Sequence, residues 1–496
     1  MALSGRPPTS LVESFSGLDV VVLGEAMLDA YLEGTSSRLC QEGPVPVVDI
    51  DRRRDVPGGA ANVAANVAAL GGRATLLSVT GADREGELVA AALERRGVDS
   101  AGLVAAGGRQ TLARQRIVSG GQLVVRFDQG TTCPVPASVE SRLIEHLTEL
   151  FAQTQAVIVS DYGYGVITPR VVAALETLQD DSPRVVVVDA KDLRSYKAVG
   201  ITAAKPNYRQ VAELLGRVPA AGVERVDEVT AAAETLLDAT GAQIVAVTLD
   251  RHGAVVLERG RPAHRTFAAG APDARAAGAG DSFVSALTLA LASGAHTPAA
   301  AEIAAAAAAV VVGKPTTATA TAAELRASLS LASHKCLRDR PSLRRSLEVA
   351  RREGRRVVFT NGCFDLLHRG HIAYLNRAKL LGDVLIVGVN SDASVARLKG
   401  PLRPVNRLDD RMEVLAGLSS VDLVVAFEED TPERLIELIE PDVFVKGGDY
   451  SVDMLPEARA VEAHGGSVAI LDYVEDTSTT GILERVRGAQ GAATAP

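Results

Sequence analysis

Short β-branched runs alternate with longer Ala- and Leu-rich stretches along the first half of the chain. The runs at 20–23, 156–160, 185–189 and 244–248 are continuously apolar, which is typical of parallel strands buried on both faces. The stretch at 62–70 is amphipathic at helical spacing. Strands separated by helices of about 10–15 residues indicate βαβ units. The pattern therefore predicts a parallel sheet covered by helices.

Two stretches break this pattern. Residues 44–51 and 115–128 alternate apolar and polar side chains, the second around a Gly120–Gly121 turn. Alternation with period two is typical of antiparallel strands with one solvated face. We expect these strands to form a flap over a site.

The pattern restarts after a change of composition near residue 315. Residues 314–323 are small and polar, and 335–356 hold nine Lys/Arg but three acidic residues, which predicts a solvated linker and an exposed helix. A nucleic-acid arm is the alternative, but no aromatic residues interleave to stack on bases. Strands at 356–360, 384–390, 422–427, 443–446 and 467–471 and helices at 371–381 and 411–418 then follow. We expect an α/β domain over 1–325, a linker and helix over 326–350, and a smaller α/β domain over 351–496.

The composition excludes several classes of protein. With 47% hydrophobic residues and a net charge of −9, the chain is neither mostly disordered nor a general nucleic-acid binder. Its four cysteines lack C-x-x-C spacing, and no apolar stretch reaches the 18 residues of a spanning helix. The first 20 residues lack a secretory pattern. We expect a cytoplasmic protein without membrane or nucleic-acid partners.

A glycine-rich turn precedes an apolar helix at 276–283 (AAGAGDSF). The backbone N–H groups of Gly278, Ala279 and Gly280 can converge there on an anion. Asp281, in the first helical turn, can accept a proton from a hydroxyl attacking a γ-phosphoryl group. By itself this pattern is equally an ordinary helix start.

Other segments at strand ends strengthen the catalytic interpretation. Asp29 follows the first strand, PGGAANVAANVAAL starts at Pro57, and AKPN and TLDRHG end later strands. Together these segments resemble the ribokinase-like (PfkB) sugar kinases over roughly residues 15–325. The resemblance implies a three-layer α/β/α fold with a β lid, the sugar on Asp29, Gly58, Gly59 and Asn62, an anion hole at 278–280, and Asp281 as base. It also implies that the ATP and Mg²⁺ side is lined by Asn207, Tyr208, Arg209, Gln210, Thr248 and Gly253.

Three features depart from the family pattern. Arg275, Ala276 and Ala277 precede Gly278, Gln210 replaces an acid that helps to hold Mg²⁺, and Asp250 replaces a glycine. Because Mg²⁺ prefers carboxylate oxygens, the second departure weakens the expected metal site. A degenerate, non-catalytic kinase scaffold therefore stays an alternative.

The second half contains a strand that runs into VVFTNGCFDLLHRGH at 357–371. His368 and His371 lie three positions apart at a helix start, where Gly370 lets a phosphate approach. Such a pair suits stabilising charge on an α-phosphate during in-line attack. Zinc binding is disfavoured because no third ligand lies nearby, so we expect no protein-bound metal site.

These residues resemble the cytidylyltransferase-like nucleotidyltransferases over roughly 350–490, together with VNSD, RMEVL, KGGDY and DTSTT. The resemblance implies ATP as co-substrate and histidines at the reacting phosphates. The expected nucleotide-binding residues are Thr360, Asn361, Gly362, Phe364, Gly370, Arg411, Lys446, Ser478, Thr479 and Thr480. Those expected to bind or shape the substrate site are Asp365, Asp392, Lys399 and Asp449.

A sugar kinase followed by a nucleotidyltransferase suggests successive steps. The order resembles the family of bifunctional heptose enzymes, which phosphorylate D-glycero-β-D-manno-heptose 7-phosphate at C1 and later make ADP-heptose from the 1-phosphate and ATP. Heptose phosphates and ATP are thus the expected partners. We also expect a homo-oligomer, namely a dimer formed through the kinase domain. Arg38, Arg116 and Lys191 are candidate cations for the substrate phosphate. Another sugar phosphate, or CTP, remains an alternative.

Overall fold

The computed structural model describes residues 8–219, 224–267, 278–312, 314, 317–330, 335–337, 339–448 and 455–471. The chain divides into two compact units, Met1–Ser328 and Leu329–Pro496. Within the described ranges, no helix has the length and apolar character needed to cross a membrane.

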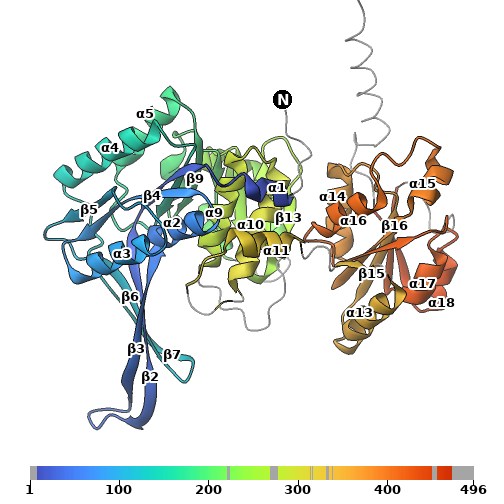
Figure 1. The fold of residues 1–496 in the computed structure, drawn as a ribbon, viewed down its shortest axis with the longest axis horizontal. Coiled ribbons are helices and arrows are strands. Elements are labelled where there is room, and N and C mark those ends of the chain that lie inside the picture. The colour runs from blue at the N-terminus through green and yellow to red at the C-terminus, as the bar shows by residue number, and fades with distance from the viewer. Residues whose placement is uncertain are drawn as a thin grey trace, which may run out of the picture. The chain divides into compact units, whose positions relative to one another are not determined.

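The first unit is built on a nine-stranded sheet (Figure 1). Its order is β13-β12-β11-β10-β9-β8-β1-β4-β5, and all neighbours pair in parallel except β11–β12 and β12–β13. The strands are β1 (Asp19–Gly24), β4 (Arg73–Gly81), β5 (Leu103–Ala106), β8 (Ala156–Asp161), β9 (Val185–Ala190), β10 (Ala203–Ala204), β11 (Ile244–Thr248), β12 (Ala254–Glu258) and β13 (His264–Thr266). The predicted strands at 20–23, 156–160, 185–189 and 244–248 are confirmed.

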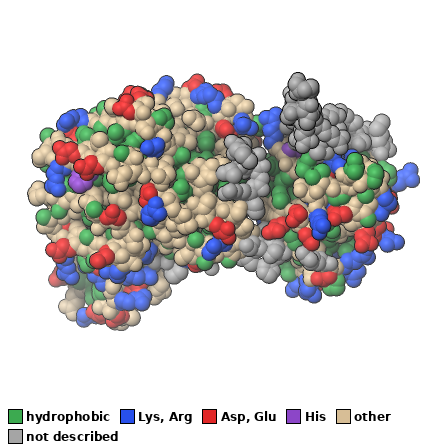
Figure 2. Space-filling model, turned by 45° about the horizontal axis from the view of Figure 1, so that its top comes forward, with side chains coloured by type: hydrophobic (Ala, Val, Ile, Leu, Met, Phe, Trp, Pro, Cys, Tyr) green, Lys and Arg blue, Asp and Glu red, His purple; other side chains and the backbone are tan. Residues whose placement is uncertain are grey.

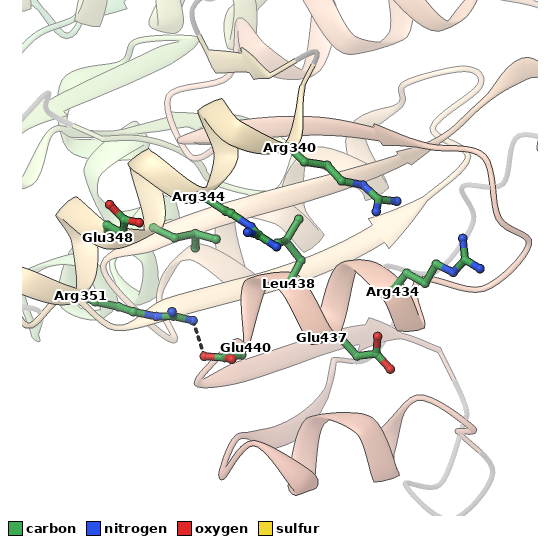
Figure 3. A pocket seen from close by; sticks show the side chains of 9 residues that line it. Arg340, Arg344, Glu348, Arg351, Arg434, Glu437, Leu438 and Glu440 are labelled. Carbon is green, nitrogen blue, oxygen red and sulfur yellow. Dashed lines mark hydrogen bonds and ion pairs between the residues drawn. The ribbon is translucent and has the colours of Figure 1, made fainter.

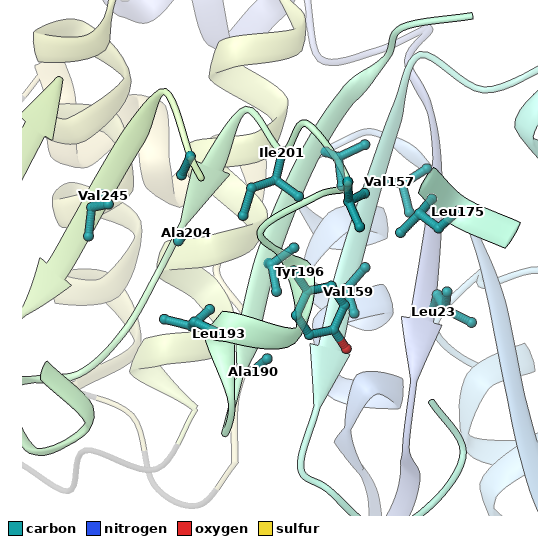
Figure 4. Close-up of a cluster of buried hydrophobic side chains, with 14 of the residues drawn as sticks. Leu23, Val157, Val159, Leu175, Ala190, Leu193, Tyr196, Ile201, Ala204 and Val245 are labelled. Atoms are coloured by element: carbon teal, nitrogen blue, oxygen red, sulfur yellow. The ribbon is translucent and has the colours of Figure 1, made fainter. Parts of the chain in front are cut away.

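Helices cover both faces of this sheet. On one side α2, α9 and α10 pack together, and on the other a large apolar cluster joins the sheet to α4, α5, α6 and α8 (Figure 4). The helices are α1 (Pro8–Glu13), α2 (Ala60–Ala69), α3 (Arg84–Glu94), α4 (Ala137–Phe151), α5 (Pro169–Asp181), α6 (Tyr208–Leu214), α7 (Glu224–Ala231), α8 (Ala233–Thr240), α9 (Ala279–Ala292), α10 (Thr297–Val312) and α11 (Ala322–Ser330), with the 3₁₀ turns η1 (Leu193–Tyr196) and η2 (Asp250–His252). The three-layer prediction is confirmed.

A separate four-stranded sheet, here called the flap, extends from this body (Figure 1). Its order is β3 (Pro46–Gly59), β2 (Ala26–Leu39), β6 (Leu112–Ser119) and β7 (Gln122–Gln129). The predicted hairpin at 115–128 is confirmed, but β2 was missed and it pairs with β6 in parallel. The first six residues of β2 are all buried, so its root lacks the alternation that marks a half-solvated strand.

The second unit contains a parallel sheet of order β14-β17-β16-β15-β18-β19. Its strands are β14 (Cys336–Leu337), β15 (Val357–Gly362), β16 (Val384–Asn390), β17 (Leu423–Phe427), β18 (Val443–Gly447) and β19 (Ser467–Leu471). Its helices are α13 (Arg340–Arg352), α14 (Arg369–Lys379), α15 (Asp392–Lys399), α16 (Leu408–Ala416), α17 (Glu433–Ile439) and α18 (Ala458–Ala463). α14 and α16 pack on one face of the sheet, and α13, α17 and α18 on the other. The smaller Rossmann-like domain is confirmed.

The segment expected as a solvated linker and exposed helix needs a correction. Cys336 and Leu337 form β14 at the sheet edge, and α13 buries Leu343, Leu347 and Ala350 in the core of the second unit. Its arginines occupy the opposite, solvated face, so the basic run is one side of an amphipathic helix. In the face drawn in Figure 2, charged side chains of both signs are interspersed over the described surface.

Candidate active sites

The first site lies at the topological switch point of the sheet, where the order of the strands along the chain reverses. β1 lies between β4 and β8, and in such sheets ligands bind outside the carboxyl ends of the strands at this point. Gly278, just before α9, has φ of +90°, a conformation that favours glycine and turns the chain into the helix. Asp281 follows in the first turn of α9, as predicted.

The Asp281 carboxyl is held by an amide. Asn62 donates from Nδ2 to Asp281 Oδ2 at 2.5 Å. Burial raises the pKa of Asp281 to about 6, aided by the charges of Asp189 and Asp29, while the Asn62 hydrogen bond and Lys205 act in the opposite direction. The group is therefore ionised at pH 7 yet more basic than an ordinary aspartate, which suits a general base.

Asp29 is another residue predicted to contact the sugar. It is 4% exposed and accepts hydrogen bonds from Arg116 Nη1 at 2.8 Å and from Thr317 Oγ1 at 3.2 Å. A Cβ at Gly58 would lie 2.8 Å from Asp29 Oδ2, so a glycine is needed beside this carboxylate. The structure thus gathers Asp29, Gly58, Asn62 and Asp281 around one site, since the Asp29 charge is close enough to affect Asp281.

Sequence reasoning missed two residues of this site. Lys205 forms an ion pair with Asp189 at 2.8 Å and lies 3.4 Å from the position of a Cβ on Gly280, next to the expected anion hole. Its place directly before the Pro206–Asn207 pair was an available signal. Thr317 comes from a small polar stretch near residue 315, which offers no signal for a role at Asp29.

The expected nucleotide side is assembled only in part. Asn207 and Thr248 are brought together by an isolated parallel bridge. Tyr208, however, is buried, with its hydroxyl donating to Glu228, and Arg209 is exposed and paired with Glu213. These two contacts favour structural and surface roles over the predicted nucleotide contact.

Gln210 is already engaged at the position of the expected Mg²⁺ ligand. Its Oε1 accepts from the Asn207 backbone N–H at 2.8 Å and its Nε2 donates to the Ala190 carbonyl at 3.0 Å. Within the described ranges, no group of three or more His, Cys, Asp or Glu side chains is arranged to hold a metal ion. The side chains here do not fit a direct Mg²⁺ site, so we derive no step through a protein-bound metal.

The second site also lies at a topological switch point of its sheet, where β15 is flanked by β16 and β18. His368 precedes α14 and His371 lies in its first turn, with ring centroids 3.8 Å apart. The His368 backbone N–H donates to His371 Nδ1 at 3.4 Å, which leaves His371 Nε2 to carry the proton. Phe364, with φ of +44°, is buried and packs against His371 at 5.3 Å.

Both imidazoles are neutral at pH 7. Burial and the neighbouring His368 lower the pKa of His371 to about 4, and burial lowers the pKa of His368. They can therefore act as uncharged hydrogen-bond donors to a phosphate. Lys446, which donates to Asn361 Oδ1 at 3.0 Å and pairs with Glu457 at 3.3 Å, supplies a cation near the same strand ends.

Arg411 has a different use from the predicted phosphate contact. Its guanidinium is buried and donates to the carbonyls of Asn406, Cys363 and Asn390 and to Asp392 Oδ1. These contacts use four of the five N–H donors of the guanidinium. The contacts indicate a positioning residue that ties the ends of β15 and β16 to α15, with Asp392 as its ion-pair partner.

Asp365, in the loop between β15 and α14, has an equivalent positioning role. It is 3% exposed and accepts from Arg403 Nε and from the backbone N–H groups of Val405 and Asn406 at 2.6 and 3.1 Å. We call this arrangement of Asp365 with residues 403–406 the loop clamp. Asp365 therefore shapes the site rather than facing substrate, whereas Lys399 is exposed and free of such contacts within the described part of the chain.

The remaining predicted residues are distributed as follows. Thr360 shares a 2.6 Å hydrogen bond with the Tyr374 hydroxyl. Gly362 ends β15, and Gly370 lies in the first turn of α14 between the two histidines. Gly59 closes β3, Ala279 begins α9, and Gly253 follows η2. Asp449, Ser478, Thr479 and Thr480, like Arg275 to Ala277, lie outside the described residues.

A cavity of about 580 Å³ lies apart from the predicted site residues. α13 and α17 line it with arginines, glutamates and two leucines, among them Arg344, Arg434 and Glu437 (Figure 3). Basic and acidic side chains nearly balance in number there, and none of the predicted catalytic or binding residues lines the cavity.

Comparison with known proteins agrees with both domains. The sequence pattern of the family "pfkB family carbohydrate kinase" matches residues 18–324, and "Cytidylyltransferase-like" matches residues 359–482. In structure, phosphofructokinase-2 from Escherichia coli superposes with a TM-score of 0.52 at 20% identity, covering 62% of this chain and 97% of that protein. The fold and sites define a two-domain enzyme, a sugar kinase joined to a nucleotidyltransferase.

Curated relatives extend over both domains at once. "Bifunctional protein HldE" of Pseudomonas aeruginosa is 40% identical over 475 residues, which is 95% of this chain and 98% of the relative. The protein of the same name from Mesorhizobium japonicum is 40% identical over 490 residues, 98% of each chain. The chain belongs to this HldE family, which confirms the predicted resemblance to the bifunctional heptose enzymes.

Proposed function

We propose that the chain catalyses two steps of ADP-heptose synthesis. In the first unit, the C1 hydroxyl of D-glycero-β-D-manno-heptose 7-phosphate attacks the γ-phosphorus of ATP. The new O–P bond replaces the bond to the bridging oxygen of ADP, and Asp281 accepts the hydroxyl proton. The observation that carries this proposal is the Asp281 carboxylate, which Asn62 orients and burial makes more basic.

In the second unit, a phosphate oxygen of heptose 1-phosphate attacks the α-phosphorus of ATP, and pyrophosphate leaves. His368 and His371 donate neutral N–H groups to the oxygens on which charge builds. A separate phosphatase has to remove the 7-phosphate between the steps, because the kinase product is a bisphosphate. ATP enters as co-substrate at both sites, with Mg²⁺ on its phosphates.

The test is an incubation of the purified protein with heptose 7-phosphate, a bisphosphatase, Mg²⁺ and each nucleoside triphosphate in turn. ADP-heptose formed only with ATP is the expected product. A CDP-sugar would refute the choice of nucleotide. Formation of ADP-heptose from heptose 1-phosphate but never from heptose 7-phosphate would favour a non-catalytic kinase scaffold.

We also infer a cytoplasmic homodimer formed through the kinase unit. All four cysteines are free, which supports a reducing compartment. The flap exposes Leu39, Ile50, Leu123 and Phe127, which a second copy could cover. Sedimentation of the full chain, with Leu123→Ser and Phe127→Ser together as the variant, tests the dimer.

A further inference from the structure

A fully buried carboxylate lies next to the kinase site and has no part in the chemistry described above. Glu25 lies between β1 and β2 and is 0% exposed. Its Oε2 accepts from the backbone N–H of Tyr162 at 2.8 Å. Its Oε1 accepts from the backbone N–H groups of Tyr164 and Val166, both at 3.2 Å. All three donors belong to residues 161–166 at the end of β8, here called the tyrosine loop, so one carboxylate fixes three of the loop's amides.

The tyrosine loop is shaped to surround this carboxylate. Gly163 and Gly165 have φ of +72° and +82°, conformations that favour glycine. Positive φ at alternate residues lets the intervening N–H groups face a single anion, which here is the Glu25 side chain. Asp161 accepts from the Gly163 N–H at 2.8 Å and from the hydroxyl of Tyr196 at 2.6 Å (Figure 4). Two carboxylates therefore hold the loop through its backbone.

Arg109 holds the carbonyl side of the same loop. It is buried, and it donates from Nη2 to the Tyr164 carbonyl at 2.9 Å and from Nη1 to the Cys133 carbonyl at 2.8 Å. Burial lowers the pKa of Arg109, and the nearby Glu25 charge opposes this shift. Protonation of Glu25 would put a hydrogen on one of two oxygens that face N–H groups. The contacts of the loop therefore require the ionised form of Glu25.

The tyrosine loop brings an aromatic ring to the catalytic base. Tyr162 is half-buried at the end of β8, which lies next to β1 at the switch point of the sheet. Desolvation raises the pKa of its hydroxyl well above the ordinary value, and the charges of Asp281 and Asp189 add to this shift. Because such effects weaken with distance, the ring lies close to Asp281. The Tyr164 ring stacks on it at 6.2 Å, so both rings depend on the path of the loop.

We propose that Glu25 is a positioning residue for the kinase step. Its ionised carboxylate fixes the tyrosine loop, and the loop places Tyr162 as a wall of the sugar site beside Asp281. Glu25 itself touches neither substrate nor the reacting atoms, because it is fully buried. The inference rests on the proposed kinase function and adds a residue that sets how tightly the sugar is held.

The charge of Glu25 gives this role a signature in pH. Burial and the charge of Asp161 raise the pKa of Glu25 to about 7, against the three N–H bonds that lower it. The charged and titratable groups that face it are Asp161 of β8, Arg109 between β5 and β6, and Tyr196 of η1. As the pH falls through about 7, Glu25 gains a proton and the loop loses an acceptor. KM for the sugar should then rise, while kcat follows Asp281.

The test measures KM for heptose 7-phosphate and kcat of the kinase step between pH 6 and pH 8. Glu25→Gln is the variant, because its amide nitrogen cannot accept from the loop. Glu140→Gln is the matched control, since Glu140 is also buried and accepts from Thr168 and Arg170 just after the loop. We expect Glu25→Gln to raise KM at pH 8 about 10-fold, as for one lost hydrogen bond to a charged group. The sugar phosphate also titrates in this range, but equally in all proteins compared.

A double-mutant cycle separates positioning from a general loss of structure. Tyr162→Ala removes the ring and leaves the Glu25 contacts, which are to backbone N–H groups. If Glu25 acts through this ring, the double variant has a KM no higher than that of the worse single variant. We also expect Glu25→Gln to lose the rise in KM below pH 7 that is specific to the ionisation of Glu25, whereas Glu140→Gln keeps it.

Each result separates the inference from the function on which it rests. A Glu25→Gln enzyme with the KM and pH profile of the unmodified protein refutes the positioning role while the kinase function stands. Effects of Glu25→Gln and Tyr162→Ala that multiply in the double variant overturn it too, as does an unchanged KM in Tyr162→Ala, even where Glu25→Gln fails to fold. If the unmodified enzyme does not phosphorylate heptose 7-phosphate, the kinase function fails. The rise in melting temperature caused by that sugar then replaces KM, and an equal rise in Glu25→Gln overturns the inference.

Discussion

Replacing Asp281 by asparagine tests the assignment of the base, because the structure predicts opposite effects on activity and stability. The amide keeps the shape of the carboxyl and can still accept the hydrogen bond from Asn62, but it cannot accept a proton. General-base catalysis contributes typically 10²- to 10⁴-fold, and we expect kcat of the kinase step to fall by about that factor.

The expected gain in stability follows from the pKa of the carboxyl. Its folded value of about 6 lies above the ordinary value of 3.8, so the unfolded chain releases this proton more readily. The native state therefore loses relative stability as pH rises from about 4 to about 6, and the full cost remains at pH 7. Two pKa units at about 1.4 kcal/mol each give an upper bound of about 3 kcal/mol, which Asp281→Asn would relieve.

The assay combines ADP release with thermal unfolding of the kinase unit at pH 7 and pH 5. Adenylyl transfer by the same preparation serves as the internal control. We expect an inactive kinase whose unit unfolds at a higher temperature at pH 7, with a smaller difference at pH 5. Retention of more than a tenth of the kinase activity would show that another group accepts the proton. A variant less stable than the unmodified protein at pH 7 would refute the inference that the ionised Asp281 carboxylate destabilises the kinase unit.

Three further predictions follow from the site contacts. The kcat of the kinase step should fall at acid pH with a midpoint near 6, as Asp281 gains a proton, and a profile flat from pH 5 to 8 would contradict this. His371→Ala should lower adenylyl transfer about 10²- to 10³-fold without changing kinase activity, measured by pyrophosphate release, and unchanged transfer would exclude the histidine. Arg411→Lys should destabilise the second unit by about 3 kcal/mol in denaturant unfolding, because one ammonium cannot satisfy the four acceptors that the buried guanidinium contacts. If that variant instead folds normally and loses only nucleotide affinity, Arg411 is a phosphate ligand after all.

Much of the fold could be predicted because apolar periodicity reports burial directly. The strands at 244–248, 384–390 and 467–471 have the observed bounds. β2 was missed because its root is buried on both faces and its end is exposed, so neither half alternates. The basic run at 335–356 was assigned to solvent because charge outnumbers the three apolar positions by which α13 packs.

The candidate site could be predicted where chemistry is local in sequence. Asp281 and the histidine pair lie within their own glycine-rich or strand-end segments, so a short window carries the signal. Thr317 reaches Asp29 across 288 residues, and the burial of Arg411 depends on carbonyls from three separate segments. No periodicity encodes such long-range pairings, because they are decided by tertiary packing.

The loop clamp has a consequence for which positions of the 403–406 loop can be changed. Asp365 holds 403–406 partly through the backbone N–H groups of Val405 and Asn406, which every residue except proline supplies. The Asn406 side chain also donates to the Asp365 carbonyl at 2.8 Å, so within this pair only the side chain at 405 can vary while the loop keeps its path. Asp365 itself has no such latitude, because its loss would release several donors together. Changes to this loop are therefore best made at the exposed side chain of Val405, with the aspartate left untouched.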